Sequence, residues 1–291
     1  MAELAFACPL CGGGRIEPLH RYERAQLSRC HTCGFVFSMR RPGDDELGRH
    51  YGGYSRMDFD SPLTRQRYRE LLERFERYRA LGRILDVGCG IGFFLEEAQR
   101  DRWDARGTEF GSRAVEINLA KGFDVVDAAT DAALFEPGYF DVVTAFEVIE
   151  HVRDPRAHIA SIARLVRPGG LFYCTTPNFD SLSRRVLRDR WTVIDYPEHL
   201  NYFTLSTLER LLGCFGFAAL EVVSTGLSFA RLQRTLTSAD GPAQPGATLD
   251  ESLRSQFDRS RFLTGARNAV NGVLGVTGTG DTLKGWFERR G

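Results

Sequence analysis

Four cysteines near the N-terminus stand in two pairs with the spacing of metal ligands. They are Cys8, Cys11, Cys30 and Cys33, and a glycine follows the second cysteine of each pair. Two intervening residues allow both sulfurs of a pair to face one ion from a tight turn, in which the glycine can adopt a positive φ. Two such turns supply the four thiolates of a closed structural zinc site. The spacing therefore predicts a zinc-binding segment, with disulfides or free thiols as the alternative.

A glycine-rich turn forms a second group. Residues 84–92 read Ile-Leu-Asp-Val-Gly-Cys-Gly-Ile-Gly, which predicts a strand, a turn and the start of a helix. Glycines allow backbone amides to approach a ligand closely, and the N-terminus of the next helix favours electron-rich groups. Glu109 follows Gly90 by 19 residues and ends the next predicted strand, where a carboxylate can accept hydrogen bonds from both hydroxyls of a ribose. Together these features indicate a nucleoside-binding turn.

A glutamate and a histidine form a third group. Glu198 and His199 lie in the segment 191–203, which follows a predicted strand at 171–175. Open α/β sheets bind ligands at the carboxyl ends of their strands, so we expect this segment to border the substrate. Imidazole titrates near neutral pH, which makes His199 the first choice as a general base. Glu198 or Glu150 could orient it or raise its basicity. The alternative is a buried His199 tied to a backbone carbonyl.

The elements that must position these groups follow from hydrophobic periodicity. Between residues 63 and 81, aromatic and leucine side chains recur at spacings of three and four, which predicts an amphipathic helix. From residue 83 onward, short β-branched runs alternate with helical patterns, and this alternation predicts a doubly wound α/β fold with parallel strands and crossover helices. Strands are expected at 83–88, 105–110, 125–127, 140–146, 171–175 and 217–224, and helices at 92–102, 112–121, 154–167 and 205–215.

Composition narrows the choice of partner. Thirty-eight basic and 38 acidic residues cancel, whereas proteins that hold a nucleic acid through phosphate contacts usually carry a basic excess. We therefore expect a small-molecule substrate and no nucleic acid. No apolar run approaches the ~18–20 residues that cross a bilayer, and residues 1–4 show no secretory signal. With the paired thiols, these features predict a cytoplasmic protein without a membrane span. Cys89, Cys174 and Cys214 are expected to be small buried residues.

The glycine-rich turn resembles the Asp-x-Gly-x-Gly-x-Gly motif of class I S-adenosylmethionine-dependent methyltransferases. The resemblance runs from about residue 80 to 225 and includes the motifs at 140–143, 147–152 and 167–170. It implies a Rossmann-like fold with a seven-stranded sheet and S-adenosylmethionine as the cofactor. The cofactor-binding residues that it implies are Asp86, Gly88 and Gly90 around the methionine part, Glu109 at the ribose, Asp127 and Ala128 at the adenine, and Phe110 and Phe146.

Two further features resemble sugar C-methyltransferases, namely the four-cysteine segment and the Glu-His-Leu-x-Tyr-Phe sequence at 198–203. That family also carries a tyrosine-rich stretch, which here is residues 50–54. The substrate-lining residues that the resemblance implies are Glu198, His199, Tyr54 and His151. For Tyr54 the alternative is packing between domains. The implied activity is methyl transfer to oxygen or carbon of a small hydroxylated acceptor, such as a sugar, a nucleotide-linked sugar or another glycan or natural-product precursor.

A rival site uses some of the same residues. Glu147, Glu150 and His151, with His199 as a fourth ligand, resemble the magnesium site of small-RNA 2′-O-methyltransferases and of some ubiquinone O-methyltransferases. Two carboxylates and two imidazoles suit a divalent ion of middling hardness. The alternative activity is therefore metal-assisted O-methylation of a quinone-like or polyketide phenol. From another class, the cysteine segment alone fits a nucleic-acid-binding or rRNA-modifying protein, which the zero net charge and the missing Asn-Pro-Pro-Tyr motif disfavour.

Four regions are expected along the chain. They are a zinc-knuckle domain at 1–45, a tyrosine-rich linker with the amphipathic helix at 46–82, the S-adenosylmethionine-binding core at 83–225, and a C-terminal helical extension with a last strand at 226–291. Within the last region, a polar loop is predicted at 231–260, a helix near 260–275 and a strand at 281–289.

Overall fold

A sheet of seven strands forms the centre of the computed structural model, which describes residues 3–4, 7–43, 46, 61–127, 135–226, 272 and 274–291. The strands follow the order β12-β13-β10-β9-β6-β7-β8. Strand β13 is antiparallel to both β10 and β12, whereas the neighbours from β10 to β8 pair in parallel. This arrangement confirms the predicted doubly wound α/β class. The bounds are β6 Arg83–Val87, β7 Asp104–Glu109, β8 Asp124–Asp127, β9 Phe140–Phe146, β10 Val166–Pro177, β12 Phe217–Thr225 and β13 Thr282–Arg289.

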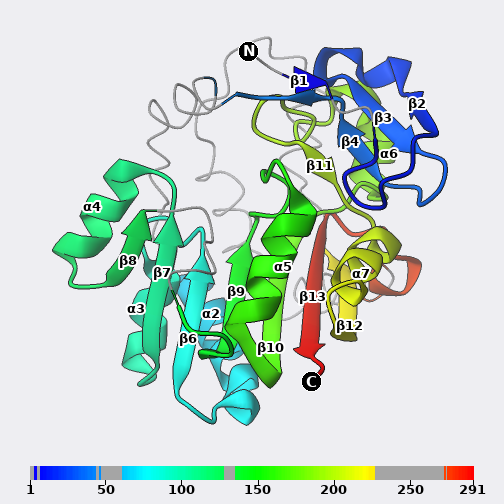
Figure 1. Cartoon of the computed structure of the whole chain (residues 1–291). Coiled ribbons are helices and arrows are strands. Elements are labelled where there is room, and N and C mark those ends of the chain that lie inside the picture. The colour runs from blue at the N-terminus through cyan, green and yellow to red at the C-terminus, as the bar shows by residue number, and fades with distance from the viewer. Residues whose placement is uncertain are drawn as a thin grey trace.

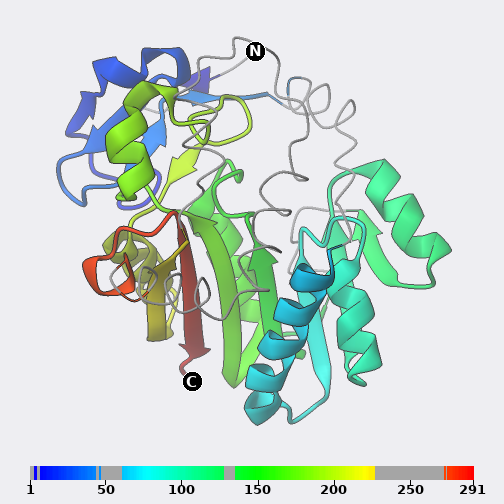
Figure 2. The ribbon, with the colours of Figure 1, turned by 180° about the vertical axis from the view of Figure 1, so that it is seen from behind.

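Helices cover both faces of the sheet because successive side chains of its buried strands point to opposite sides. Leu85 and Val143 belong to the apolar cluster that includes α5 and α7, while Ile84 and Val142 belong to the cluster that includes α2 and α3. Helix α5 lies on the side seen in Figure 1 and α2 on the side seen in Figure 2. The helices are η1 His20–Ala25, α2 Pro62–Phe75, η2 Glu76–Tyr78, α3 Phe93–Arg100, α4 Ser112–Ala120, α5 Pro155–Leu165, α6 Leu182–Leu187, η4 Arg188–Arg190 and α7 Leu205–Gly213.

Several helix bounds differ from those predicted, and two helices show the reason. The helix predicted at 63–81 is α-helical only to Phe75 and then tightens into the 3₁₀ turn η2. The helix predicted at 154–167 begins after Asp154, whose side chain accepts from the backbone N–H groups of Arg156 and Ala157, both at 2.9 Å. It ends at Leu165 because Val166 already pairs with Phe140 of β9.

A second, four-stranded sheet contains the cysteine segment. Its order is β11-β4-β3-β2, with β2 at Ile16–Pro18, β3 at Leu27–Cys30, β4 at Val36–Ser38 and β11 at Asn201–Tyr202. Strand β11 thus pairs with the N-terminal segment although it follows β10 in the sequence. In Figure 1 these N-terminal strands lie beside α6 and β11, next to the large sheet. A short ladder between β1 (Glu3–Leu4) and β5 (Arg40–Arg41) adjoins them.

The described residues also bear on the remaining predictions. Strand β13 confirms the strand predicted at 281–289. Cys89 and Cys174 are buried as expected, but Cys214 is exposed because it follows the last residue of α7 on the outside of the molecule, so that prediction was wrong. Within the described ranges, the helices are too short or too polar to cross a membrane. The positions that lie outside the described residues are Tyr54, Ala128, the loop predicted at 231–260 and most of the helix predicted near 260–275.

Candidate active site

The turn after β6 has a fixed shape. Gly88, Gly90 and Gly92 take φ values of +68°, +53° and +84°, which side-chain-bearing residues rarely adopt. The backbone N–H of Gly88 donates to the carbonyl of Thr108 at 2.8 Å. A Cβ atom at Gly88 would come within 2.7 Å of Val148 Cγ2. The turn therefore needs glycine both for its backbone conformation and for the space beside β9.

Glu109 joins the end of β7 to this turn. Its Oε2 accepts from the N–H of Gly90 at 2.8 Å, and its Oε1 accepts from those of Phe110 at 2.8 Å and Gly111 at 3.1 Å. Three backbone donors hold the carboxylate over the turn. Because an ionised carboxylate has about four lone-pair positions, it retains capacity to accept from ligand hydroxyls. The structure thus brings together the glycine turn and the strand-end acid.

Asp86, at the base of the turn, is buried on β6. Its Oδ1 accepts from Thr144 Oγ1 at 2.7 Å. Burial is the main reason why the pKa of this carboxyl is raised to about 8; the negative charge of Glu109 adds to the shift and the Thr144 bond opposes it. A cationic ligand at the turn would favour the charged form of Asp86.

Asn118 supports the turn and was not predicted from the sequence. Its side chain is buried on α4, and its Nδ2 donates to the carbonyls of Gly90 at 2.7 Å and Ala114 at 2.9 Å. Nearby, Lys121 Nζ donates to the carbonyl of Ile91 at 2.7 Å. Asn118 could have been selected from the sequence because it is a polar residue three positions after Val115, on the buried stripe of the predicted helix 112–121.

The other predicted cofactor residues lie at the same edge of the sheet. Asp127 ends β8 directly opposite Glu109 in the parallel ladder, and Phe110 is exposed beside it. Phe146 ends β9 within a group of rings, with its centroid 5.2 Å from that of Phe94 and 5.4 Å from that of Tyr68. Tyr68 brings α2 to this edge, a contact that sequence reasoning missed.

Two histidines meet at the carboxyl ends of β9 and β10. The ring centroids of His151 and His199 are 4.7 Å apart. His151 Nδ1 is 2.8 Å from the carbonyl oxygen of Glu198, and His199 Nδ1 is 2.7 Å from that of Val193. Because a carbonyl only accepts, each Nδ1 carries the proton, and Nε2 is the acceptor in the neutral ring. The hydrogen bond to a backbone carbonyl that was the alternative for His199 is present. It nevertheless leaves Nε2 of the neutral ring unprotonated, so that this nitrogen can accept a proton.

Glu150 and Asn201 hold this pair in position. Glu150 is buried, its Oε2 accepts from Thr176 Oγ1 at 2.9 Å, and its Oε1 is 3.8 Å from His151 Nε2. The Glu150 carbonyl accepts the backbone N–H of Asn201 at 3.0 Å, and Asn201 Nδ2 donates to the carbonyl of Val152 at 2.6 Å. Asn201, which the sequence analysis did not select, thereby ties the segment of Glu198 and His199 to the end of β9.

Three of the four ligands predicted for magnesium come together. The ligand atoms of Glu150, His151 and His199 lie within 4.8 Å of one another. Glu147 is not a member of this group. It directly follows β9, with φ at +53°, and its backbone N–H donates to the carbonyl of Thr175 at 3.1 Å. This backbone turn separates Glu147 from the group formed by Glu150, His151 and His199.

The four N-terminal cysteines form a compact group of sulfurs. Cys8 and Cys33 have their Sγ atoms 3.6 Å apart, as do Cys11 and Cys30, and all four lie within 4.8 Å of one another. None of the four takes part in a disulfide, which contradicts the disulfide part of the alternative. In a tetrahedron with Zn–S bonds of ~2.3 Å the sulfurs are about 3.8 Å apart. The observed spacing therefore fits a four-thiolate metal site.

Comparison with known proteins agrees with this geometry. A family model described as a methyltransferase domain matches residues 63–222, more than half of the sequence, and the chain belongs to this family. The ubiquinone biosynthesis O-methyltransferase of Thiobacillus denitrificans is 37% identical over 108 residues, which are 35% of this chain and 47% of that protein. The chain thus spans about half the length of the curated relatives it matches.

Solved structures share the fold. A SAM-dependent methyltransferase from Archaeoglobus fulgidus aligns with a TM-score of 0.54 and 18% identity, over 78% of this chain and 93% of that one. A phosphoethanolamine N-methyltransferase from Haemonchus contortus in complex with S-adenosylmethionine aligns with a TM-score of 0.51 and 22% identity, over 81% and 55%. The family model thus identifies a methyltransferase domain, and the solved structures share its fold.

Proposed function

We propose that this methyltransferase binds S-adenosylmethionine at the carboxyl ends of β6, β7 and β8 and methylates a small hydroxylated acceptor. The proposed acceptor is a sugar, a nucleotide-linked sugar or another glycan or natural-product precursor, methylated on oxygen or carbon. This class of acceptor is supported by the pairing of β4 with β11, which brings the cysteine segment into direct contact with the segment that contains Glu198 and His199. The four cysteines would hold a structural zinc ion, and the free thiols fit a cytoplasmic protein.

The residues around the turn fit the cofactor. Asp86 and Glu109 present two carboxyl groups to a cationic sulfonium and its amino group, and Gly88 and Gly90 leave room for the methionine part. Glu109 can accept the ribose hydroxyls with the lone pairs that the backbone donors leave. For the adenine and the outer side of the cofactor, the proposed contacts are Asp127, Ala128, Phe110 and Phe146. When bound, the cofactor supplies an electrophilic methyl group.

The proposed general base is His199. Its Nδ1 bond to the Val193 carbonyl fixes the ring and leaves Nε2 as proton acceptor, which is the single observation that carries this role. His151, Glu198 and Tyr54 would line the acceptor, and the buried Glu150 would stabilise the positive charge that the imidazole pair gains with a proton. Alignment of nucleophile, methyl carbon and sulfur in a site closed to water would supply most of the remaining acceleration.

We expect His199→Ala to lower methyl transfer about 10²- to 10⁴-fold, because it removes the proton acceptor. The assay would screen nucleotide-linked sugars and catechols with labelled cofactor and then compare wild type and variant on the acceptor found. Calorimetric titration with S-adenosylhomocysteine is the control and should give equal affinities for both proteins. Full turnover by the variant would show that His199 is not the base.

A second candidate function is metal-assisted O-methylation of a quinone-like phenol. The grouping of Glu150, His151 and His199 within 4.8 Å favours it, as does the similarity to ubiquinone O-methyltransferases. Two imidazoles and one carboxylate suit a divalent ion of middling hardness. The same assay separates the two functions when it is run with a chelator too weak to remove zinc from four thiolates. A large loss, restored by added Mg²⁺ or Mn²⁺, would favour the metal-assisted reaction.

A further inference from the structure

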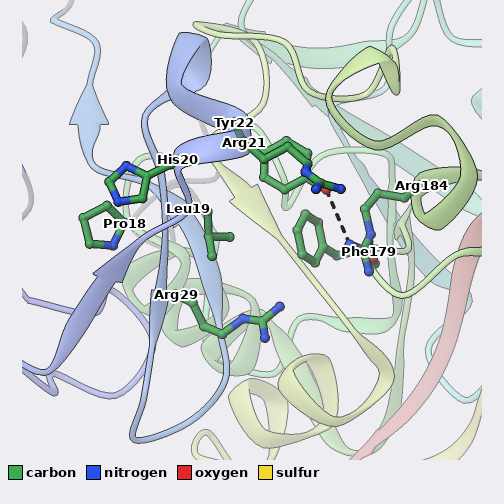
Figure 3. Close-up of a pocket in the computed structure, with 8 residues that line it drawn as sticks. All are labelled: Pro18, Leu19, His20, Arg21, Tyr22, Arg29, Phe179 and Arg184. Carbon is green, nitrogen blue, oxygen red and sulfur yellow. Dashed lines mark hydrogen bonds between the residues drawn. The ribbon is translucent and has the colours of Figure 1, made fainter.

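A cavity of about 320 Å³ lies between the N-terminal segment and the region of α6, away from the glycine turn. The residues that line it are Pro18, Leu19, His20, Arg21, Tyr22, Arg29, Phe179 and Arg184. Figure 3 shows Arg29 reaching from β3 toward the side on which Phe179 and Arg184 lie. None of the residues proposed for the cofactor, the general base or the metal sites lines it, so it is a second site.

The lining is basic. Three arginines and one histidine line the cavity, and no acidic residue does. Arg21 and Arg29 are exposed, and within the part of the chain that the structure describes neither guanidinium has a carboxylate partner. Two acids near the cavity have other partners: Asp180 is 3.8 Å from Arg184, and Glu17, which stands opposite Arg29 in the ladder of β2 and β3, is 3.2 Å from His31. In a chain with no net charge, this local excess favours an anion.

Arg184 is fixed rather than mobile. Its Nε donates to the Phe179 carbonyl at 2.5 Å and its Nη1 to Tyr22 Oη at 3.4 Å, while its guanidinium lies 4.4 Å from the centroid of the Phe179 ring. The Tyr22 and Phe179 rings meet edge to face, with centroids 6.0 Å apart. The cavity thus has a rigid aromatic wall beside a positioned cation, with Pro18 and Leu19 adding apolar surface. A site of this size is suited to a small molecule.

We infer that this cavity binds a phosphate-bearing small molecule. A phosphate group presents several oxygens to more than one guanidinium and can pair with each in a bidentate manner. The apolar wall would contact the organic part that carries the phosphate. The cavity is linked to the proposed base by one ring: Phe179 packs on Tyr202 with centroids 5.8 Å apart, and Tyr202 Oη donates to the His199 carbonyl at 3.1 Å.

Calorimetric titration of the full-length, metal-loaded protein with inorganic pyrophosphate tests the inference. We expect saturable binding that the double variant Arg21→Gln/Arg29→Gln weakens at least tenfold, because it removes the two guanidinium groups that lack partners. Arg210→Gln, at an exposed arginine on α7, is the matched control and should leave the affinity unchanged. Unchanged S-adenosylhomocysteine binding would show that the double variant is folded.

Three results would overturn the inference. The first is the absence of pyrophosphate binding by the wild type, and the second is equal affinity in the double variant. The third is tight binding of a short RNA at physiological salt that the double variant loses and pyrophosphate does not compete for, which would make the surface a polyanion site. Neither result would touch the proposed function, because the cofactor and His199 are tested by separate titrations and variants.

Discussion

Among single residues, Asp86 carries the clearest consequence for stability. Burial raises the pKa of its carboxyl to about 8 in the folded protein, compared with 3.8 for an ordinary aspartate. Between these values the folded state binds more protons than the unfolded state. The contribution of this group to stability is therefore fully present below about pH 4 and is lost as the pH rises through 8.

We accordingly expect Asp86→Asn to flatten the pH dependence of the free energy of unfolding of the ligand-free protein between pH 4 and 8. Asparagine keeps an acceptor for Thr144 but cannot ionise, so at pH 8 the variant should be more stable by on the order of 5 kcal/mol, which is about 1.4 kcal/mol for each unit of the pKa shift. Urea denaturation at a series of pH values measures this. Asp104→Asn, at an exposed position on β7, is the control. Equal slopes for wild type and Asp86→Asn would contradict the prediction.

The site residues differ in how far the sequence could identify them. Asp86, Glu109 and His199 could be selected from local motifs: Asp86 precedes the glycine-rich turn, Glu109 lies 19 residues after Gly90, and His199 belongs to the Glu-His sequence after a predicted strand. The protonated nitrogen of His199 could not be predicted, because it depends on how residues 191–199 bring the Val193 carbonyl to the ring. Asn201 could not be identified from the sequence for a similar reason, because the Val152 carbonyl to which it donates lies 49 positions earlier.

Among the elements, the turn after β6 allows a test with a matched pair of glycines. Gly92 and Gly122 have similar φ values, +84° and +82°. A Cβ atom at Gly92 would overlap Asn118 Oδ1 and lie 3.3 Å from the Phe123 ring, whereas nothing lies within 4 Å of one at Gly122. Alanine at either position would suffer the same backbone strain. Only at Gly92 would its methyl group also collide with the Asn118 side chain, which supports the turn.

We therefore expect Gly122→Ala to cost about 1–2 kcal/mol of stability, the backbone penalty alone, and to retain cofactor affinity. Gly92→Ala should cost about 2–4 kcal/mol, because crowding is added to strain. It should also weaken S-adenosylhomocysteine binding at least tenfold, since it displaces the Asn118 side chain from the Gly90 carbonyl. Denaturation and calorimetry measure both effects. Equal losses of stability and affinity in the two variants would show that backbone strain, and not crowding by Asn118, explains the need for glycine at position 92.

The sequence predicted the main elements and missed the small ones for physical reasons. The central strands β6, β9 and β10 are mostly buried on both faces, so their apolar runs stand out from the intervening helices. Strand β11 has two residues, too few for a periodic pattern, and its partner in β4 lies some 165 positions earlier in the sequence. Contacts such as Phe179 with Tyr22 follow from that pairing and could not be foreseen without it.

For the whole molecule, the cysteine segment and the proposed substrate side form one packed unit. Cys8, Cys30 and Phe35 belong to the apolar cluster of α5 and α7. The Phe35 ring lies 5.0 Å from that of Phe203, which directly follows β11. Disorder in the cysteine segment would therefore displace His199, while the glycine turn after β6 would keep its own supports from Glu109 and Asn118.

We therefore expect removal of the proposed zinc ion to lower methyl transfer more than about tenfold, through misplacement of the acceptor side. S-adenosylhomocysteine affinity should change less than about twofold over the same treatment. Elemental analysis, transfer assays and calorimetry on protein before and after a strong chelator measure this. Cys8→Ser should reproduce the loss of metal, and Cys214→Ser, at an exposed thiol, should not. Parallel loss of both properties would contradict the prediction.

The position of β13 has a consequence for biosynthesis. This strand lies between β10 and β12, yet both of those are translated before it. While the ribosome has not yet delivered residues 282–289, β10 presents an open edge and β12 has no neighbour to join it to the sheet. Open edges recruit other chains. A nascent chain of this protein therefore depends on residues 282–289 to close the sheet, and a stop codon before Thr282 would leave an aggregation-prone product.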